Sequence, residues 1–236
     1  MEFWTFFTAK PLLWLIVTIT TFIVTSWFNR RVGGTPLLHP VLVSLALIIM
    51  FLLLTGTSYE TYFEGAQFIH FLMGPATVAL AVPLFDHLER VKKMILPLLL
   101  ACMAGAITAA ASALLVAQWL DASVGTLLSL APKSVTSPIA IGIAEKLGGY
   151  PSLASGLVLV TGAIGCILAP PIYQMLNIKD DAVKGFTLGV AAHGMGTAFA
   201  FEYGLLAGAF GGLAMGMTGA FTAFMLPVLV ELMGIG

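Results

Sequence analysis

Three long stretches of this chain contain no Asp, Glu, Lys or Arg, and this feature limits the fold more than any other. They run from Met94 to Leu120, from Leu147 to Ile178 and from Tyr203 to Val230. Each exceeds the roughly 20 apolar residues that carry a helix across a hydrocarbon core of about 30 Å. Only 9% of the 236 residues are charged, whereas soluble domains carry about 25%. The composition therefore predicts an all-α, polytopic integral membrane protein in the lipid bilayer.

Apolar segments bounded by charges are predicted to be membrane spans: Pro11–Phe28, Leu38–Thr55, Gly65–Phe85 and Met94–Leu120. Two later stretches, 123–147 and 184–203, are more polar and are interrupted. The chain has eight spans if both cross and six if both dip in and return. The basic loop residues then divide six inside to three outside, or seven to two, so the positive-inside rule does not decide between them. Either count places both termini outside, and residues 1–236 are interpreted as a single membrane domain.

A proline-rich segment interrupts the first of these stretches. Because a proline disfavours helical geometry in the residue before it, a helix that begins near Val124 is predicted to end near Ala131. Ser137 followed by Pro138 predicts an N-cap and a second half-helix that runs to Lys146. Backbone groups left unpaired at bilayer depth are costly, so such a break survives where protein or a water-filled cavity surrounds it. Broken helices of this kind mark binding sites in secondary transporters.

Lys133 lies inside this break, with long weakly charged sequence on both sides. Charged side chains within membrane segments are rare and usually face a partner or a pathway. One hypothesis is an anion site, because the start of a half-helix offers amides and positive dipole to a carboxylate. Its candidate residues are Lys133, Ser134, Thr136, Ser137 and Pro138. The alternative is that the segment lies at the membrane interface and Lys133 reaches the water.

An earlier segment, Gly74–Leu84, resembles the second half-helix. Shifted by 63 residues it falls on Ser137–Leu147, with Pro, Ala and Leu matching. The match indicates either an internal repeat or ordinary proline kinks. On the repeat interpretation Gly74, Pro75 and Thr77 are further candidate substrate-binding residues, and the chain has three broken helices rather than two.

The second interrupted stretch contains a histidine among small residues. His193, Gly194, Gly196 and Thr197 are candidate substrate-binding residues, and the glycines are expected to supply backbone geometries closed to other residues. A histidine there can titrate near physiological pH and could carry a proton, with Glu202 as its partner. The alternative is a neutral histidine that only stabilises the fold and a glutamate that only marks the end of the segment.

A glycine ladder follows at Gly204, Gly208, Gly212 and Gly216. Small residues at this spacing let another helix approach closely. The partner helix can belong to the same chain or to a second copy, so helix packing and a homo-oligomer are both open.

Enzymatic and nucleic-acid functions have no support in the sequence. It contains no His-Glu-x-x-His, no Gly-x-Ser-x-Gly and no Walker loop, so we expect no catalytic residues, no metal site and no cofactor. The formal net charge of −1 offers no electrostatic basis for binding nucleic acid.

Three strings of residues resemble the CidB/LrgB family over nearly the whole chain. They are Leu130–Ala140 (LAPKSVTSPIA), Ala191–Ala198 (AAHGMGTA) and Gly74–Leu84 (GPATVALAVPL). The resemblance implies a multi-pass protein of the bacterial cytoplasmic (inner) membrane, named for holin-like or antiholin-like control of murein hydrolases. The family also includes the C-terminal half of the plastid glycolate/glycerate transporter, and bacterial relatives are linked to pyruvate. Its members commonly act with a small LrgA/CidA-like membrane protein.

Two functions follow from the residues and the resemblance together. The first is a transporter or facilitator of small monocarboxylates of the pyruvate, glycolate or glycerate type. The second is a modulator of murein hydrolase activity and autolysis, with no substrate of its own. The interrupted segments and Lys133 favour transport, because a scaffold gains nothing obvious from costly unpaired backbone.

Overall fold

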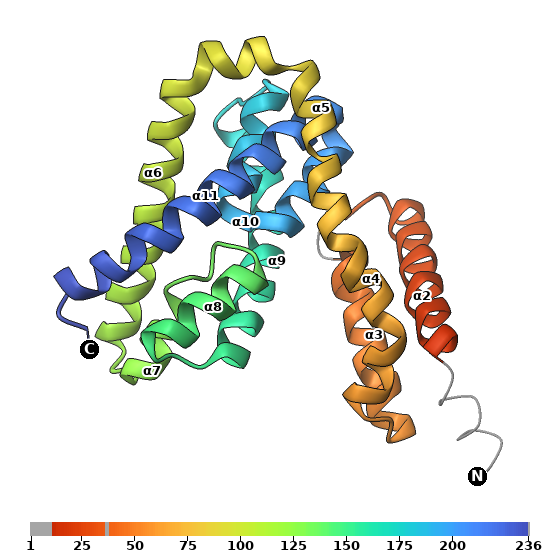
Figure 1. Ribbon diagram of the computed structural model, residues 1–236. Helices are drawn as coiled ribbons and strands as arrows, with labels where there is room; N and C mark the ends of the chain where they lie inside the picture. The colour runs from red at the N-terminus through yellow and green to blue at the C-terminus, as the bar shows by residue number, and fades with distance from the viewer. Residues whose placement is uncertain (1–10, 36–37, 236) are drawn as a thin grey trace. The chain divides into compact units, whose positions relative to one another are not determined.

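The computed structural model describes residues 11–35 and 38–235, except for the side chain of Thr77, and this part of the chain contains helices and no strands. The helices are α2 (Pro11–Arg31), α3 (Pro40–Thr55), α4 (Tyr59–Ala79), α5 (Ala81–Asp86), α6 (Leu88–Trp119), α7 (Val124–Leu130), α8 (Ser137–Leu147), α9 (Pro151–Met175), α10 (Asp181–Ala200) and α11 (Leu205–Leu232), with a 3-10 turn, η2 (Phe201–Tyr203), before α11 (Figure 1).

Five helical segments within the described residues are long and apolar enough to cross a membrane. They are α2, the α4–α5 segment (Tyr59–Asp86), α6, α9 and α11. Helix α3 has 16 residues and is therefore about 24 Å long, shorter than the hydrocarbon core. Helices α7, α8 and α10 are not among the candidate spans. The prediction of an all-α, polytopic membrane protein is confirmed.

The chain divides into two compact units, Met1–Ala79 and Leu80–Gly236, called unit 1 and unit 2 below. In unit 1, α2 packs on α3 and α4 around Trp14, which is fully buried. The indole meets the rings of Phe51 and Tyr62 edge-on, with centroids 6.2 and 5.8 Å away. A hydrogen bond of 2.7 Å between the buried hydroxyls of Thr25 and Ser44 joins α2 to α3.

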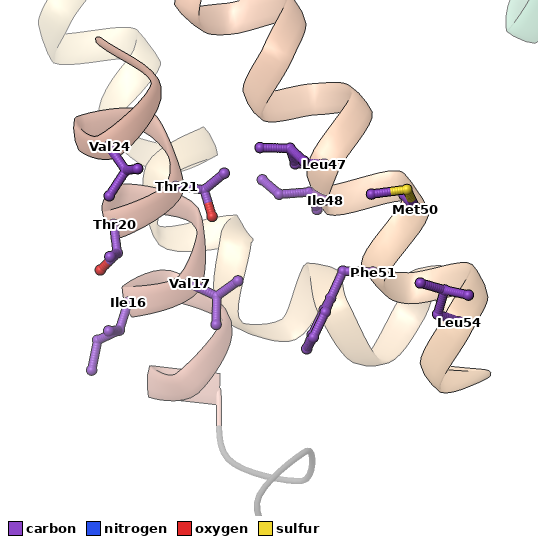
Figure 2. A pocket seen from close by; sticks show the side chains of 10 residues that line it. All are labelled: Ile16, Val17, Thr20, Thr21, Val24, Leu47, Ile48, Met50, Phe51 and Leu54. Carbon is purple, nitrogen blue, oxygen red and sulfur yellow. The ribbon is translucent and has the colours of Figure 1, made fainter. Parts of the chain in front are cut away.

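An open groove of about 560 Å³ lies between α2 and α3, and Figure 2 shows the side chains of Val17 and Thr21 pointing toward Ile48 and Phe51 across it. Its lining is Ile16, Val17, Thr20, Thr21, Val24, Leu47, Ile48, Met50, Phe51 and Leu54. The groove offers a carboxylate no charged partner, and its apolar character suits contact with lipid chains.

In unit 2, α6 and α11 run in the same direction. Near their N-terminal ends Leu98 packs in one cluster with Phe210, and near their C-terminal ends Leu114 packs in another with Leu226. The next long helix, α9, runs the opposite way, because its last turns contact the start of α10, where Asp180 pairs with Arg90 at the start of α6.

The first interrupted stretch forms a hairpin, residues 123–150, called hairpin 1. Helix α7 leads in, residues 131–136 form the tip, and α8 leads back. The return is closed by the buried hydroxyl of Ser129 on α7, which accepts a hydrogen bond of 2.6 Å from the main-chain nitrogen of Tyr150 just after α8. The ring of Tyr150 also lies against Gly125. Hairpin 1 therefore enters and leaves at the same end of unit 2.

The second interrupted stretch, residues 180–203, is also a hairpin and is called hairpin 2. Ala192 and His193 have non-helical backbone angles that divide α10. A Cβ added at Gly196 would collide with the carbonyl oxygen of Leu188, eight residues earlier, whereas a straight helix would separate them by about 12 Å. At the open end the Lys184 ammonium lies 5.3 Å from the ring centroid of Tyr203. Hairpin 2 thus also returns to the end it entered.

The two hairpins open at opposite ends of unit 2. Hairpin 1 opens where α6 ends and α9 begins, and hairpin 2 opens where α9 ends and α11 begins. In Figure 1 the C-terminal end of α11 lies beside α7, and the loop before α10 lies near the start of α6. With α8 11 residues long, each hairpin reaches about 16 Å, roughly half the hydrocarbon thickness. A hairpin of this length that starts at the membrane surface would end near the middle of the bilayer.

Of the two interpretations of residues 74–84, a repeat of 137–147 or an ordinary proline within a helix, the structure supports the second. Gly74 and Pro75 lie inside the continuous helix α4, whereas α8 follows the non-helical tip of hairpin 1. The structure pairs other segments: α6 is followed by hairpin 1, and the antiparallel α9 is followed by hairpin 2. Two successive segments with the same order and opposite direction form an inverted arrangement, a common plan in secondary transporters.

Candidate functional site

The tip of hairpin 1 is built by the prolines of its sequence. Helix α7 is capped by Ser123, whose hydroxyl accepts from the amide of Thr126 at 3.3 Å, and it ends at Leu130 as predicted. Helix α8 begins at Ser137, with Thr136 rather than Ser137 at the N-cap position. The Thr136 side chain makes no capping hydrogen bond. The first amides of α8, which lack acceptors within the helix, are therefore not satisfied by that hydroxyl.

Lys133 is half-buried at this tip, and its hydrogen bonds within the described part of the chain go to neutral oxygens. Its Nζ donates to the carbonyl oxygen of Ala109 on α6 and to Oγ of Ser134, both at 3.3 Å. Among the described residues the ion pairs all lie elsewhere, so no carboxylate is within 4.0 Å of this ammonium. A partly desolvated charge is costly without a counter-charge. The tip can therefore attract a small anion.

The tip of hairpin 2 is built around His193. Its backbone has φ 44° and ψ −128°, a conformation that costs about 1–3 kcal/mol in a residue other than glycine. Two hydrogen bonds hold it there. The ring Nε2–H donates to the carbonyl oxygen of Val158 on α9 at 3.0 Å, and the Thr197 hydroxyl donates to the carbonyl oxygen of His193 at 2.8 Å. The side chain is buried.

The expected role of the neighbouring glycines is therefore wrong, because the unusual backbone belongs to His193. Neither Gly194 nor Gly196 has positive φ. Gly196 is required by packing, since a side chain there would collide with the Leu188 carbonyl oxygen. Gly194 has neither constraint: an added Cβ would lie at ordinary contact distance from its neighbours.

The two tips meet. A Cβ at Gly194 would lie 4.0 Å from Cγ2 of Thr136 and 3.7 Å from Sδ of Met215 on α11. Helix α9 packs against both hairpins (Figure 1), and Val158 joins them: its carbonyl oxygen binds His193, while its side chain packs with Val135 of the first tip. The interrupted segments of the sequence are thus held face to face.

The structure brings together the part of the predicted site that belongs to the two hairpin tips of unit 2. The first tip and its edge carry Lys133, Ser134, Thr136, Ser137 and Pro138, and the second carries His193, Gly194, Gly196 and Thr197.

Gly74, Pro75 and Thr77 belong to α4 in unit 1, and the side chain of Thr77 lies outside the described ones. Glu202 is exposed in η2, at the open end of hairpin 2. It is about 13 Å along the returning half-helix from His193, so the two side chains are not hydrogen-bond partners.

The predicted glycine ladder does not form one packing face. An added Cβ at Gly208 would collide with the Phe201 ring and one at Gly212 would lie 3.4 Å from Leu80, while an added Cβ at Gly204 or Gly216 would meet nothing within 4 Å. The reason is geometric: a step of four residues turns a helix about 40° past a full turn, so the ladder winds around α11.

The tight face of α11 instead carries Ala207 and Gly211. Their carbonyl oxygens lie against Gly185 and Gly189 of hairpin 2. These two glycines are also four residues apart, so their spacing in the sequence could have predicted this packing contact. We considered the longer ladder instead. Three further groups had no sequence signal: Met215 and the carbonyl oxygens of Ala109 and Val158.

A polar cleft of about 300 Å³ lies at the open end of hairpin 2, lined by Pro170, Tyr173, Gln174, Asn177, Ile178, Lys179, Lys184 and Tyr203. The hydroxyl of Tyr173 donates to the carbonyl oxygen of Lys184 at 2.8 Å, and the Lys184 ammonium pairs with Asp181 at 2.8 Å. The cleft is polar and lies at one end of the hairpin, so it can admit a small hydrophilic solute.

These features define a class: a multi-pass helical membrane protein with two helical hairpins that open at opposite ends of unit 2 and meet at their tips. The chain belongs to the LrgB-like family, whose model matches residues 18–232. The predicted resemblance is confirmed, and the match runs across both units.

Known relatives cover nearly the whole chain. An uncharacterized protein of Bacillus subtilis, YxaC, is 35% identical over 92% of this chain and 94% of its own length. The holin-like protein CidB of Staphylococcus epidermidis is 29% identical over 94% of this chain and 97% of its own. The antiholin-like protein LrgB of Bacillus subtilis is 27% identical over 96% of this chain and 98% of its own length. No solved structure matches the chain.

Proposed function

We propose that this protein transports small monocarboxylates, of the pyruvate, glycolate or glycerate type, through a site between the two hairpin tips. The observation that carries the proposal is the close approach of the two tips. A Cβ added at Gly194 in the second tip would lie 4.0 Å from Cγ2 of Thr136 in the first. Secondary transporters build their sites from broken helices that meet near the middle of the bilayer. A scaffold without a substrate gains nothing obvious from this arrangement.

Lys133 would supply the positive charge for the carboxylate. Its ammonium donates to the neutral oxygens of Ala109 and Ser134, so a bound carboxylate would add the missing counter-charge. The uncapped start of α8 would add amide donors and positive dipole. One ammonium without an acidic neighbour among the described residues balances one carboxylate, which favours a monocarboxylate over a dicarboxylate.

The two hairpins would separate this site from the two sides of the membrane. Basic residues gather where hairpin 2 opens: Arg90, Lys92, Lys93, Lys179 and Lys184. By the positive-inside rule that end would lie in the cytoplasm, and the protein would lie in the bacterial cytoplasmic (inner) membrane. Hairpin 1 would then open to the outside, and movement of one tip at a time would expose the site to one side at a time.

A second function is supported by the names of the relatives, holin-like CidB and antiholin-like LrgB. In that case the chain modulates murein hydrolase activity as part of a membrane assembly. A small LrgA/CidA-like membrane protein is the proposed partner for either function, and a homo-oligomer is compatible with both.

Uptake measurements separate the two functions. The purified chain would be placed in proteoliposomes with and without the small partner, and uptake of labelled pyruvate, glycolate and glycerate measured. We expect Lys133→Ala to abolish uptake while insertion is unchanged, and Lys133→Arg to keep part of it. Lys146→Ala, at the exposed end of α8, is the matched control. Unchanged uptake in Lys133→Ala would contradict the anion site. Absence of uptake by the wild type in both preparations, with altered hydrolase activity in cells, would favour the second function.

A further inference from the structure

Gly194 lies where the two hairpin tips approach each other, yet neither its backbone angles nor a close contact requires glycine there. At Gly185 a side chain would collide with the Ala207 carbonyl oxygen, and at Gly204 the backbone has φ 130°. Gly194 has no positive φ, and an added Cβ would meet its nearest neighbours at 3.7 and 4.0 Å, which is ordinary contact. Alanine would fit there and is the better helix former. The missing side chain therefore leaves space rather than relieving a clash.

The space left at Gly194 lies at the junction of the two tips. Its nearest neighbours are the thioether sulfur of Met215 and the methyl group of Thr136. Both are apolar, whereas Lys133 and Ser134, three and two residues before Thr136, provide the polar part of the same tip. A short acid has the same two parts, because a carboxylate is joined to a small alkyl or hydroxyalkyl group.

We infer that Gly194 and Met215 determine which acids the site accepts by limiting the size of the group attached to the carboxylate. This inference rests on the proposed transport function and adds to it the residues that set specificity. The absence of a side chain at Gly194 leaves space for the group attached to the carboxylate. The flexible side chain of Met215 on α11 bounds this space on one side. A methyl group added at position 194 takes up part of this room, and truncation of Met215 enlarges it.

The prediction is a change in size preference rather than a general loss. Gly194→Ala should reduce uptake of the longest accepted acid by at least about tenfold more than that of the shortest, since one methylene group in a tight pocket changes discrimination by about 10- to 200-fold. Met215→Ala should do the reverse, and admit straight-chain or branched acids, of four or five carbons, that the wild type excludes. The gain in Met215→Ala cannot result from misfolding.

The experiment measures proteoliposome uptake of acids from two to five carbons by the wild type, Gly194→Ala, Met215→Ala and two controls. Gly142→Ala adds a methyl group on α8, and Gly216→Ala adds one on α11 next to Met215; both positions have nothing within 4 Å. Opposite shifts in the two test variants and an unchanged profile in the controls support the inference. Lys133-dependent uptake by the wild type with the same size profile in every variant overturns the inference alone. Absence of any uptake by the wild type overturns the transport function and the inference with it.

Discussion

The main-chain nitrogen of Tyr150 donates a hydrogen bond of 2.6 Å to the side-chain hydroxyl of Ser129. This bond joins the two arms of hairpin 1 at its open end. The same hydroxyl donates to the carbonyl oxygen of Gly125 at 2.6 Å, so one buried group satisfies two main-chain atoms from the two arms of the hairpin. A segment that crossed the membrane would carry its two ends to opposite sides. This contact holds them together, and hairpin 2 has its equivalent in the packing of Lys184 on Tyr203.

This geometry predicts which positions share a side of the membrane. With Cys102 and Cys166 replaced by alanine, single cysteines at Asp121 and Gly148 should react with a membrane-impermeant maleimide from the outside. Cysteines at Lys179 and Glu202 should react only from the cytoplasmic side, because the positive-inside rule predicts that the basic end of unit 2 faces inward.

Labelling of intact cells and of inverted vesicles checks this prediction. A permeant maleimide confirms that each cysteine is reactive. Labelling of the positions at 121 and 148 from opposite sides would mean that hairpin 1 crosses the bilayer. The same result for 179 and 202 would mean that hairpin 2 crosses.

The break at the first tip could be predicted from sequence because the effect of proline is local. Helix α7 ends one residue before the predicted Ala131, and α8 begins one residue before the predicted Pro138. The direction of the chain after the break could not be predicted. A stretch of 25 mostly apolar residues suits both a crossing and a hairpin, and the choice depends on contacts such as Ser129 with Tyr150 between residues far apart in sequence.

The second tip shows a different limit of sequence reasoning. Glycine is the residue that most readily adopts positive φ, so Gly194 and Gly196 were the expected turn residues, yet His193 has the φ of 44°. Hydrogen bonds to Val158 and from Thr197 offset the strain. Because Val158 lies on another helix, no pattern within the stretch itself could reveal this compensation. The chemistry of its side chain, rather than its conformation, makes His193 a candidate site residue.

Replacement of His193 by glutamine tests whether it carries a proton during transport. Glutamine keeps an N–H donor for the Val158 carbonyl oxygen but cannot titrate, whereas histidine changes charge between about pH 5 and 8. We expect His193→Gln to retain uptake and to lose its pH dependence over that range. Uptake would be measured in proteoliposomes with the internal and external pH set independently, and His70→Gln on α4 is the matched control. A pH profile identical to that of the wild type would mean that His193 only stabilises the tip.

Cross-linking tests the approach of the two tips directly, without any assumption about transport. Cysteines introduced at Thr136 and Gly194 should form a disulfide on mild oxidation, because a Cβ at 194 would lie 4.0 Å from Cγ2 of Thr136, so a small movement of the tips would bring the two sulfur atoms to bonding distance.

Mass spectrometry of protease fragments would detect the disulfide, and a pair at Gly142 and Gly194 provides the control, since residue 142 is exposed and has no neighbour within 4 Å. Cross-linking in the test pair should also block uptake reversibly, because a site closed by both tips at once cannot open to either side. A disulfide in neither pair would show that the tips lie apart, and the carboxylate site would then lack the second of its two walls.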